Sequence, residues 1–171
     1  GLLNLKDQYR NTFLDFRTEL QLNDSDEISL LAGINRSKSE IGFARSYIDL
    51  ERSEKTDSSF GLLRWRRTLS PDHEISLTAS RTTDGGEDRF IPILTLPTLV
   101  IDYGRHAVRD SIEYQHFLGL SDTWRASWGA EYRRDSVQAP QLFNTDQVQQ
   151  ANSLRAYTNL EWKPAQDWTF N

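Results

Sequence analysis

Hydrophobic and polar residues alternate with a period of two along most of this chain. Between Thr12 and Leu22 the even positions are apolar or Thr, whereas the odd positions are mostly charged or polar. A strand separates two such sets onto opposite faces, and a helix would mix them. The polar turn 23–26 leads into a second alternating segment, from Ile28 to Ile34. The two segments together predict a β-hairpin.

The same pattern recurs along the rest of the chain. Further alternating segments cover 61–69, 75–80, 111–118, 124–133 and 154–162, and another begins at Trp168. Short turns alternate with long polar connections, which we place at 36–58, 83–108 and 135–151. This spacing predicts seven complete strands and the start of an eighth, in an all-β, antiparallel up-and-down β-meander.

The long connections favour a membrane barrel over a compact soluble domain, in which long structureless loops are uncommon. Outer-membrane barrels have short periplasmic turns and longer outer loops. The last strand breaks off after Phe170, too early to cross a bilayer and close a barrel. We therefore expect residues 1–171 to form a partial transmembrane β-barrel domain, about 7–8 strands of a larger barrel.

The two sets of alternating positions differ in chemistry. One set is apolar and aromatic with essentially no charge, and the other mixes both signs of charge. A barrel would turn the first set toward lipid and the second toward its lumen, with aromatic rings at the lipid–water interface. The expected interface aromatics are Trp65, Trp124, Trp128, Trp162 and Trp168. The expected lumen-facing residues are Asp15, Arg17, Glu19, Arg64, Arg66, Glu113, Arg125, Glu131, Arg133, Arg155 and Glu161.

Composition narrows the functional classes. The chain is 37% hydrophobic with a mean hydropathy of −0.66, and no apolar run reaches the ~18 residues of a membrane-spanning helix. This does not argue against barrel strands, in which only alternate residues face lipid. The absence of cysteine excludes disulfides, zinc-thiolate sites and cysteine nucleophiles. A net charge of −5 argues against nucleic acid as a partner.

Catalytic and metal chemistry find little support. The three histidines, His73, His106 and His116, are far apart in sequence, so we expect three isolated surface side chains and no metal site. Segment 84–88 is acidic but lacks the ligand spacing of a calcium loop, and we expect a solvated loop there. Carboxylates on the charged face alternate with Arg, which favours salt bridges over acid–base catalysis. We expect no enzyme activity, no catalytic residue and no cofactor.

Ligand recognition by such a barrel would lie in its long loops. The loops combine cations with aromatic rings, which suits an anionic, aromatic metal chelate. The candidate ligand-binding residues are Arg45, Tyr47, Arg89, Tyr103, Arg105 and His106, with Arg52 in the first of these loops as well. The apolar stretch from Phe90 to Ile101 is expected to cover the barrel mouth or to extend a strand above the membrane.

Several segments resemble barrel segments of TonB-dependent outer-membrane receptors. They are 128–137, 140–143, 154–164 and the strand start Trp168-Thr169-Phe170-Asn171. The resemblance implies a barrel of about 22 strands with an N-terminal plug, in the outer membrane of a Gram-negative bacterium. It implies TonB-driven import of a scarce ligand such as a ferric siderophore or cobalamin. Outer-membrane lipid, the plug, the remaining strands and, through the plug, TonB would then be the partners. This chain carries neither the plug nor a TonB-interaction segment.

Two other readings stay open from the sequence. The strands would equally suit the barrel of a secretion or polysaccharide-export porin, which lacks a TonB-driven plug. A soluble β-sandwich binding module would also alternate apolar and polar residues, and it predicts that the Trp-bearing faces of two sheets pack together.

Overall fold

The computed structural model describes residues 8–43, 46–47, 49–92, 100–165 and 168–170. Strands dominate it, and α1 (Pro140–Phe143) is the one helix within these ranges. The strands are β1 (Tyr9–Gln21), β2 (Asp26–Ile41), β3 (Arg52–Ser70), β4 (His73–Glu87), β5 (Arg89–Phe90), β6 (Ile101–Asp102), β7 (Arg105–Gly119), β8 (Trp124–Gln138), β9 (Gln149–Ala165) and β10 (Trp168–Phe170).

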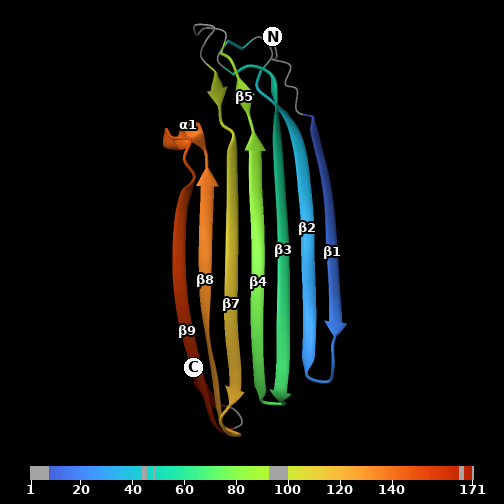
Figure 1. Ribbon diagram of the computed structural model, residues 1–171, viewed down its shortest axis with the longest axis vertical. Helices are drawn as coiled ribbons and strands as arrows, with labels where there is room; N and C mark the ends of the chain where they lie inside the picture. The colour runs from blue at the N-terminus through green and yellow to red at the C-terminus, as the bar shows by residue number, and fades with distance from the viewer. Residues whose placement is uncertain (1–7, 44–45, 48, 93–99, 166–167, 171) are drawn as a thin grey trace.

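Eight of the strands form one antiparallel sheet in the order β1-β2-β3-β4-β7-β8-β9-β10. Figure 1 shows β1 to β4 and β7 to β9 side by side in chain order. The short strands β5 and β6 pair separately and continue the β4–β7 hairpin beyond the sheet. The predicted up-and-down meander of seven long strands and the start of an eighth is therefore confirmed.

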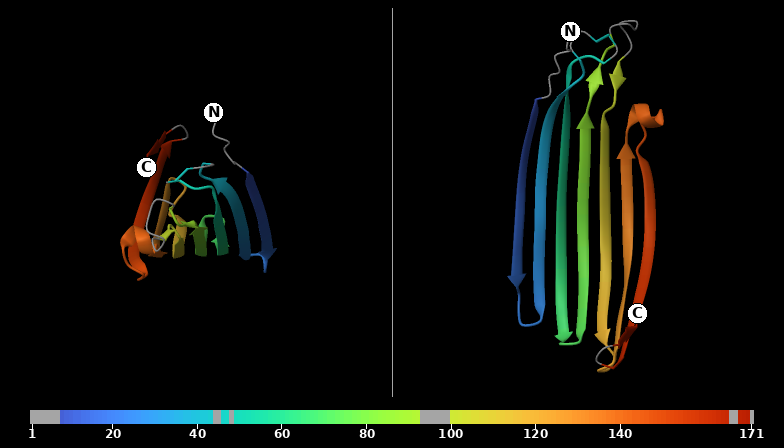
Figure 2. Two further views of the ribbon diagram at one scale, coloured as in Figure 1. Left: turned by 90° about the horizontal axis from the view of Figure 1, so that it is seen from above. Right: turned by 180° about the vertical axis from the view of Figure 1, so that it is seen from behind.

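The sheet is strongly curved. Seen from above, it has the outline of a U (Figure 2). A hollow of about 520 Å³ touches β1, β2, β3, β4 and Gln115 of β7. One hollow can touch five neighbouring strands only where the sheet bends around it, so its charged lining, which includes Arg17, Glu27 and Arg66, marks the concave face. Residues that alternate with these along the strands form the convex face.

Short turns close the sheet at one end through local side-chain hydrogen bonds. At the β1–β2 turn, the Asn23 side-chain oxygen accepts hydrogen bonds from the backbone N–H groups of Ser25 and Asp26, both at 2.9 Å. At the β7–β8 turn, the Ser121 hydroxyl accepts from the N–H groups of Thr123 and Trp124. These Asx and Ser turns explain why such short polar segments reverse the chain.

The strands are longer, and the connections shorter, than the sequence predicted. The three connections at the other end cover 42–51, 88–104 and 139–148, instead of 36–58, 83–108 and 135–151. Here the strands carry polar residues on both faces, so the apolar alternation ends while the backbone pairing continues. Hydroxyl pairs across strands, Ser37 with Thr56 at 2.5 Å and Ser59 with Thr83 at 2.7 Å, support these extensions.

The described residues lack a buried apolar core. Ala139 is the single buried hydrophobic residue among them, and many large apolar side chains of the convex face are exposed, Leu14 at 65% and Leu154 at 76%. Among the described residues the second sheet is the short β5–β6 pair, which continues the β4–β7 hairpin and does not cover this face. The soluble β-sandwich reading is therefore wrong, because it requires two sheets with their tryptophan faces in contact. Among the same residues, no helix is both long and apolar enough to cross a membrane.

Candidate functional site

The concave face collects the charged side chains. Strand register aligns them in rows, one of which runs Glu19, Ser29, Arg64, Thr78, Glu113, Glu131 and Arg155 across seven strands. The register places all eleven residues predicted to face a lumen on this one face: Asp15, Arg17, Glu19, Arg64, Arg66, Glu113, Arg125, Glu131, Arg133, Arg155 and Glu161. That this face lines a water-filled lumen stays a prediction.

These charges pair with one another across and along strands. Arg66 donates to Glu27 on the neighbouring strand at 2.5 Å, and Arg17 contacts Glu19 at the same distance. Glu113 and Glu131 lie directly opposite each other, which would be repulsive if they had no other partners. Neighbouring side chains stabilise both carboxylates. Gln115 and Tyr157 donate hydrogen bonds to Glu113 at 3.1 and 3.0 Å, and Arg155 lies 3.9 Å from Glu131.

Gly129 makes the contact of Tyr157 with Glu113 possible. Tyr157 belongs to β9 and Glu113 to β7, so the phenol must cross β8, the strand between them. A Cβ at position 129 would lie 2.5 Å from the Tyr157 hydroxyl and 2.5 Å from the carbonyl oxygen of Tyr114. Only a residue without a side chain leaves room for this bridge.

The convex face carries aromatic rings near the short turns. The rings of Trp124 and Trp162 stack at 5.4 Å, Phe170 stacks on Trp162 at 5.6 Å, and Trp168 on Phe170 at 6.0 Å. Trp128 and Trp65 occupy the same face further along the strands. All five predicted interface aromatics thus share one face, and their place at a lipid interface stays a prediction.

The expectation that this face is essentially uncharged is wrong. Arg81 and Asp110 form a two-point ion pair on it, at 2.6 and 3.0 Å. Nearer the short turns, Arg67 makes another with Asp26, at 2.8 and 2.7 Å. The charges are tolerated because each carboxylate meets the fork of an arginine, and because the two pairs lie at the two margins of the apolar band rather than within it.

The histidines are not all isolated, contrary to expectation. His73 and His116 stack with ring centroids 4.7 Å apart, and their Nε2 atoms are 2.6 Å apart. The antiparallel pairing of β4 with β7 brings them together although 43 positions separate them in sequence. Trp128 lies against His116 at 4.2 Å, which makes the pair part of the aromatic surface. In the described ranges, no group of three or more potential ligands surrounds a common metal position.

The predicted ligand-binding residues separate at the loop end of the sheet. Arg45 lies outside the described residues. Tyr47 and Tyr103 are well exposed, at 60% and 55%, and Arg89 is exposed as well. Arg105 and His106 belong to strand β7 and not to a loop, so these neighbours point to opposite faces. The structure therefore does not gather the six residues into one site, and their ligand contacts stay a prediction.

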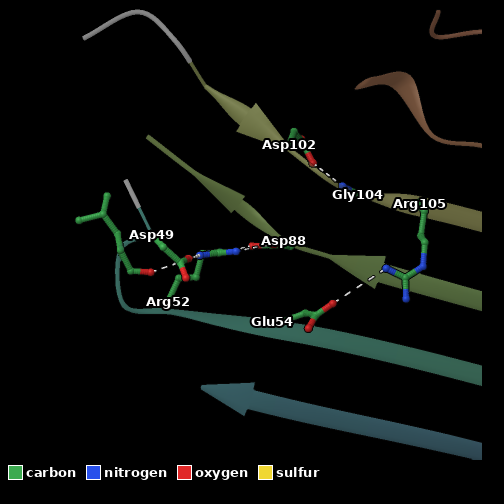
Figure 3. A network of polar contacts seen from close by, with 8 residues as sticks. Asp49, Arg52, Glu54, Asp88, Asp102, Gly104 and Arg105 are labelled. Atoms are coloured by element: carbon green, nitrogen blue, oxygen red, sulfur yellow. Dashed lines mark hydrogen bonds and ion pairs between the residues drawn. The ribbon is translucent and has the colours of Figure 1, made fainter. Parts of the chain in front are cut away.

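Arg52 is instead the centre of a polar network at this end (Figure 3). Its guanidinium donates to Asp88 at 2.5 and 3.1 Å and to Asp49 at 2.6 Å, and it lies 4.2 Å from the centre of the Phe90 ring. Its side chain is only 15% exposed, and the hydrogen bond with Asp88 raises the pKa of Arg52 above its ordinary value. This arginine joins Asp49 to Asp88, and its Nε, Nη1 and Nη2 atoms already donate to protein acceptors.

A second group of contacts lies beside it (Figure 3). Arg105 reaches across β4 toward Glu54, 3.9 Å away, and a Cβ at Gly86 would lie 2.9 Å from its guanidinium. The expected solvated loop at 84–88 is thus mostly strand: β4 continues through Glu87, and Asp88 is buried against Arg52. The sequence did not predict this part of β4, because Gly85 and Gly86 are adjacent and have no alternating apolar neighbours.

Three residues of the Arg52 network escaped the sequence analysis: Asp49, Asp88 and Phe90. The signal that could have found them is weak, because an Asp-rich segment and one aromatic residue are common in exposed loops. The chemical result is clear nonetheless. The loop end offers the exposed phenol rings of Tyr47 and Tyr103, whereas the guanidinium of Arg52 is already paired with two carboxylates.

Comparisons with known proteins bear on the fold. No family model matches the chain, and no curated protein is similar to it. Among solved structures, the chain is similar to the ferric yersiniabactin uptake receptor FyuA from Yersinia pestis, with a TM-score of 0.50 and 11% identity. The match covers 94% of this chain and 26% of that one, so the chain spans about a quarter of that receptor's length. The likeness supports the fold of a receptor-barrel wall.

Proposed function

We propose that this chain is part of the wall of an outer-membrane β-barrel receptor that imports a scarce ligand such as a ferric siderophore. The convex face meets lipid and the concave face lines the lumen. The remaining strands and a plug that engages TonB complete the receptor, and residues 1–171 are one portion of its barrel domain. The protein acts as a transporter and not as an enzyme.

The exposed apolar band of the convex face carries this proposal. Along β8 it extends from Trp124 to the row of Arg134, which pairs with Asp110 in the ladder. That length of strand is about 34 Å at ~3.4 Å per residue. A tilt of ~40° reduces it to about 25 Å, the height of the lipid-facing band of an outer-membrane barrel. In water such a surface would drive aggregation.

Receptor function finds support at the loop end. Tyr47 and Tyr103 are exposed in the connections at this end, and Arg89 is exposed there as well. Aromatic rings and cations together suit an anionic chelate. Likeness to a ferric siderophore uptake receptor agrees with this choice of ligand class but shows the fold alone.

Site-directed fluorescence tests whether the convex face is in contact with lipid. The chain has no cysteine, so Ile112→Cys and its neighbour Ser111→Cys can each carry a single bimane label. The complete protein is reconstituted in vesicles that contain dibrominated phosphatidylcholine. We expect strong quenching at position 112, on the convex face, and little at position 111, on the concave face. Equal quenching at both positions would overturn the proposed orientation.

Growth tests the receptor part separately. A strain without its own siderophore receptors, expressing the complete protein, is supplied with single ferric chelates as the iron source. Growth on at least one chelate is expected. If position 112 is quenched but no chelate supports growth, the wall stands and an export or secretion porin becomes the better assignment.

A further inference from the structure

A cluster of four cations lies on the convex face at the loop end of β1, β2 and β3. Arg10, Lys38 and Lys55 are directly opposite one another in a single row, and Arg36 lies in the next row toward the apolar band. They line a hollow of about 500 Å³. Arg36, Lys38 and Lys55 of this cation cluster belong to the polar strand extensions at 36–58, a segment that the sequence predicted to be a loop.

The cluster has an excess of positive charge. Like charges directly opposite each other on a sheet cost roughly 0.2–1 kcal/mol for each pair. Lys38 and Lys55 each have one carboxylate neighbour, Glu40 at 3.3 Å and Glu87 at 3.2 Å. Arg10 and Arg36 make no ion pair with any residue that the structure describes, although Asp57 lies opposite Arg36 in the ladder. The guanidinium groups of Arg10 and Arg36 are therefore available to bind an anion.

An apolar groove lies directly below the cluster on the same face. Leu14, Phe16, Ala32 and Ile34 line most of a hollow of about 340 Å³, and Leu14 and Ile34 form the row next to Arg36. Gly61 lies opposite Ala32 in the ladder, and the surface above it is open because no heavy atom lies within 4 Å of a Cβ built there. Cations above a shallow apolar groove match a molecule with an anionic head and a hydrocarbon tail.

We propose that the cation cluster and the groove bind a phosphorylated lipid of the surrounding membrane, with the phosphates on the arginines and an acyl chain along the groove. The proposal rests on the proposed function, because it requires the convex face to be in lipid. Arginine binds phosphate through two parallel hydrogen bonds. The cations are spaced by about 5 Å across strands and about 7 Å along them, a surface wide enough for a headgroup with more than one phosphate.

The test compares two brominated lipids at one labelled position. Bimane at Ile34→Cys, in the groove, reports which lipid occupies it. Vesicles of phosphatidylcholine contain either dibrominated phosphatidylcholine or a brominated lipid A, which carries two phosphates. We expect lipid A to quench at much lower mole fraction. In the Arg10→Gln/Arg36→Gln variant that preference should fall about 25-fold, because each cation contributes about fivefold.

Controls separate the possible failures. The matched variant Arg125→Gln/Arg155→Gln removes the same charge from the concave face and should keep the preference. Equal quenching by both lipids in the unmodified protein overturns the lipid site but leaves the wall intact. Absence of quenching by either lipid overturns both proposals. Loss of the preference on adding millimolar inorganic pyrophosphate would identify a soluble-anion site and overturn the lipid as occupant.

Discussion

The convex and concave faces consist of alternate residues of the same strands, yet side chains are held on them in different ways. On the convex face, rings such as Trp124 and Trp162 stack without hydrogen bonds between them, and charges lie outside the apolar band, as ion pairs at its margins or in the cation cluster at the loop end. On the concave face, almost every charged group lies near an opposite charge or a donor, as with Glu113 and Tyr157.

This difference shows where the specificity of the structure resides. A shift of one residue in strand register would exchange the two faces completely. Such a shift would place Arg64 or Glu113 among the tryptophans and move Leu77 to the charged face. The contrast between faces therefore fixes the register more firmly than any single contact. Experiments that move one charge from face to face can break or sharpen this contrast.

The largest effect is expected when a charge enters the middle of the convex face. Leu77 lies there, between Trp65 and Tyr114 in the ladder. Leu77→Arg in the complete protein should lower the free energy of unfolding from lipid by about 2–4 kcal/mol, the cost of arginine near the middle of a bilayer. Urea titration of the protein folded in vesicles measures it.

The neighbouring residue provides the matched control. Thr78 is on the concave face between Arg64 and Glu113 in the ladder, so in Thr78→Arg attraction to Glu113 offsets repulsion by Arg64. Its unfolding free energy should remain close to that of the unmodified protein. Equal losses for the two arginine variants would mean that the faces are not in different media.

A smaller effect is expected when a charge leaves the concave side of the loop end. Arg52→Gln leaves Asp88, which is 8% exposed, without its ion partner. Backbone amides of segment 49–52 should exchange about thirtyfold faster, which corresponds to roughly 2 kcal/mol of lost protection, and amides of the sheet should exchange as before. Arg36→Gln, on the convex face, removes the same charge without an ion partner and should leave exchange unchanged. Equal loss of protection in both variants would contradict the role of the Arg52 network.

Two glycines offer the finest comparison. Gly129 lies on the concave face beneath Tyr157, whereas the Cβ position of Gly61 on the convex face is open. Gly129→Ala should cost roughly 1.5 kcal/mol of unfolding free energy through crowding. Gly61→Ala should be neutral or gain about 0.5 kcal/mol, because alanine restricts the unfolded chain. The same urea titration distinguishes them, and a stable Gly129→Ala variant would show that the Tyr157 bridge is dispensable.

The sequence predicted the fold well because period-two alternation reports directly on strand faces. The eleven charged residues of one predicted set share the concave face of the sheet, and the five tryptophans of the other set share the convex face. The ends of the strands were harder to predict from the sequence. Beyond the apolar band, segments such as 36–41 carry polar residues on both faces, and a polar strand cannot be told from a polar loop by alternation alone.

The candidate site could be predicted only in part. Contacts such as Arg52 with Asp88 and His73 with His116 join residues 36 and 43 positions apart. Their formation depends on the register of particular strand pairs, which alternation fixes only to within two residues. The cation cluster escaped notice for the same reason, because its members come from three strands.

The pairing of each long strand with its neighbour in the chain has a consequence for how such a wall can change over evolutionary time. Every hairpin is closed by its own short turn, and hydrogen bonds join it to the neighbouring hairpins along its edges. Duplication or loss of a hairpin between two others preserves inside and outside, because it inserts or removes an even number of crossings. The circumference of a barrel wall can therefore grow in steps of two strands, while every existing side chain stays on the same face of the sheet.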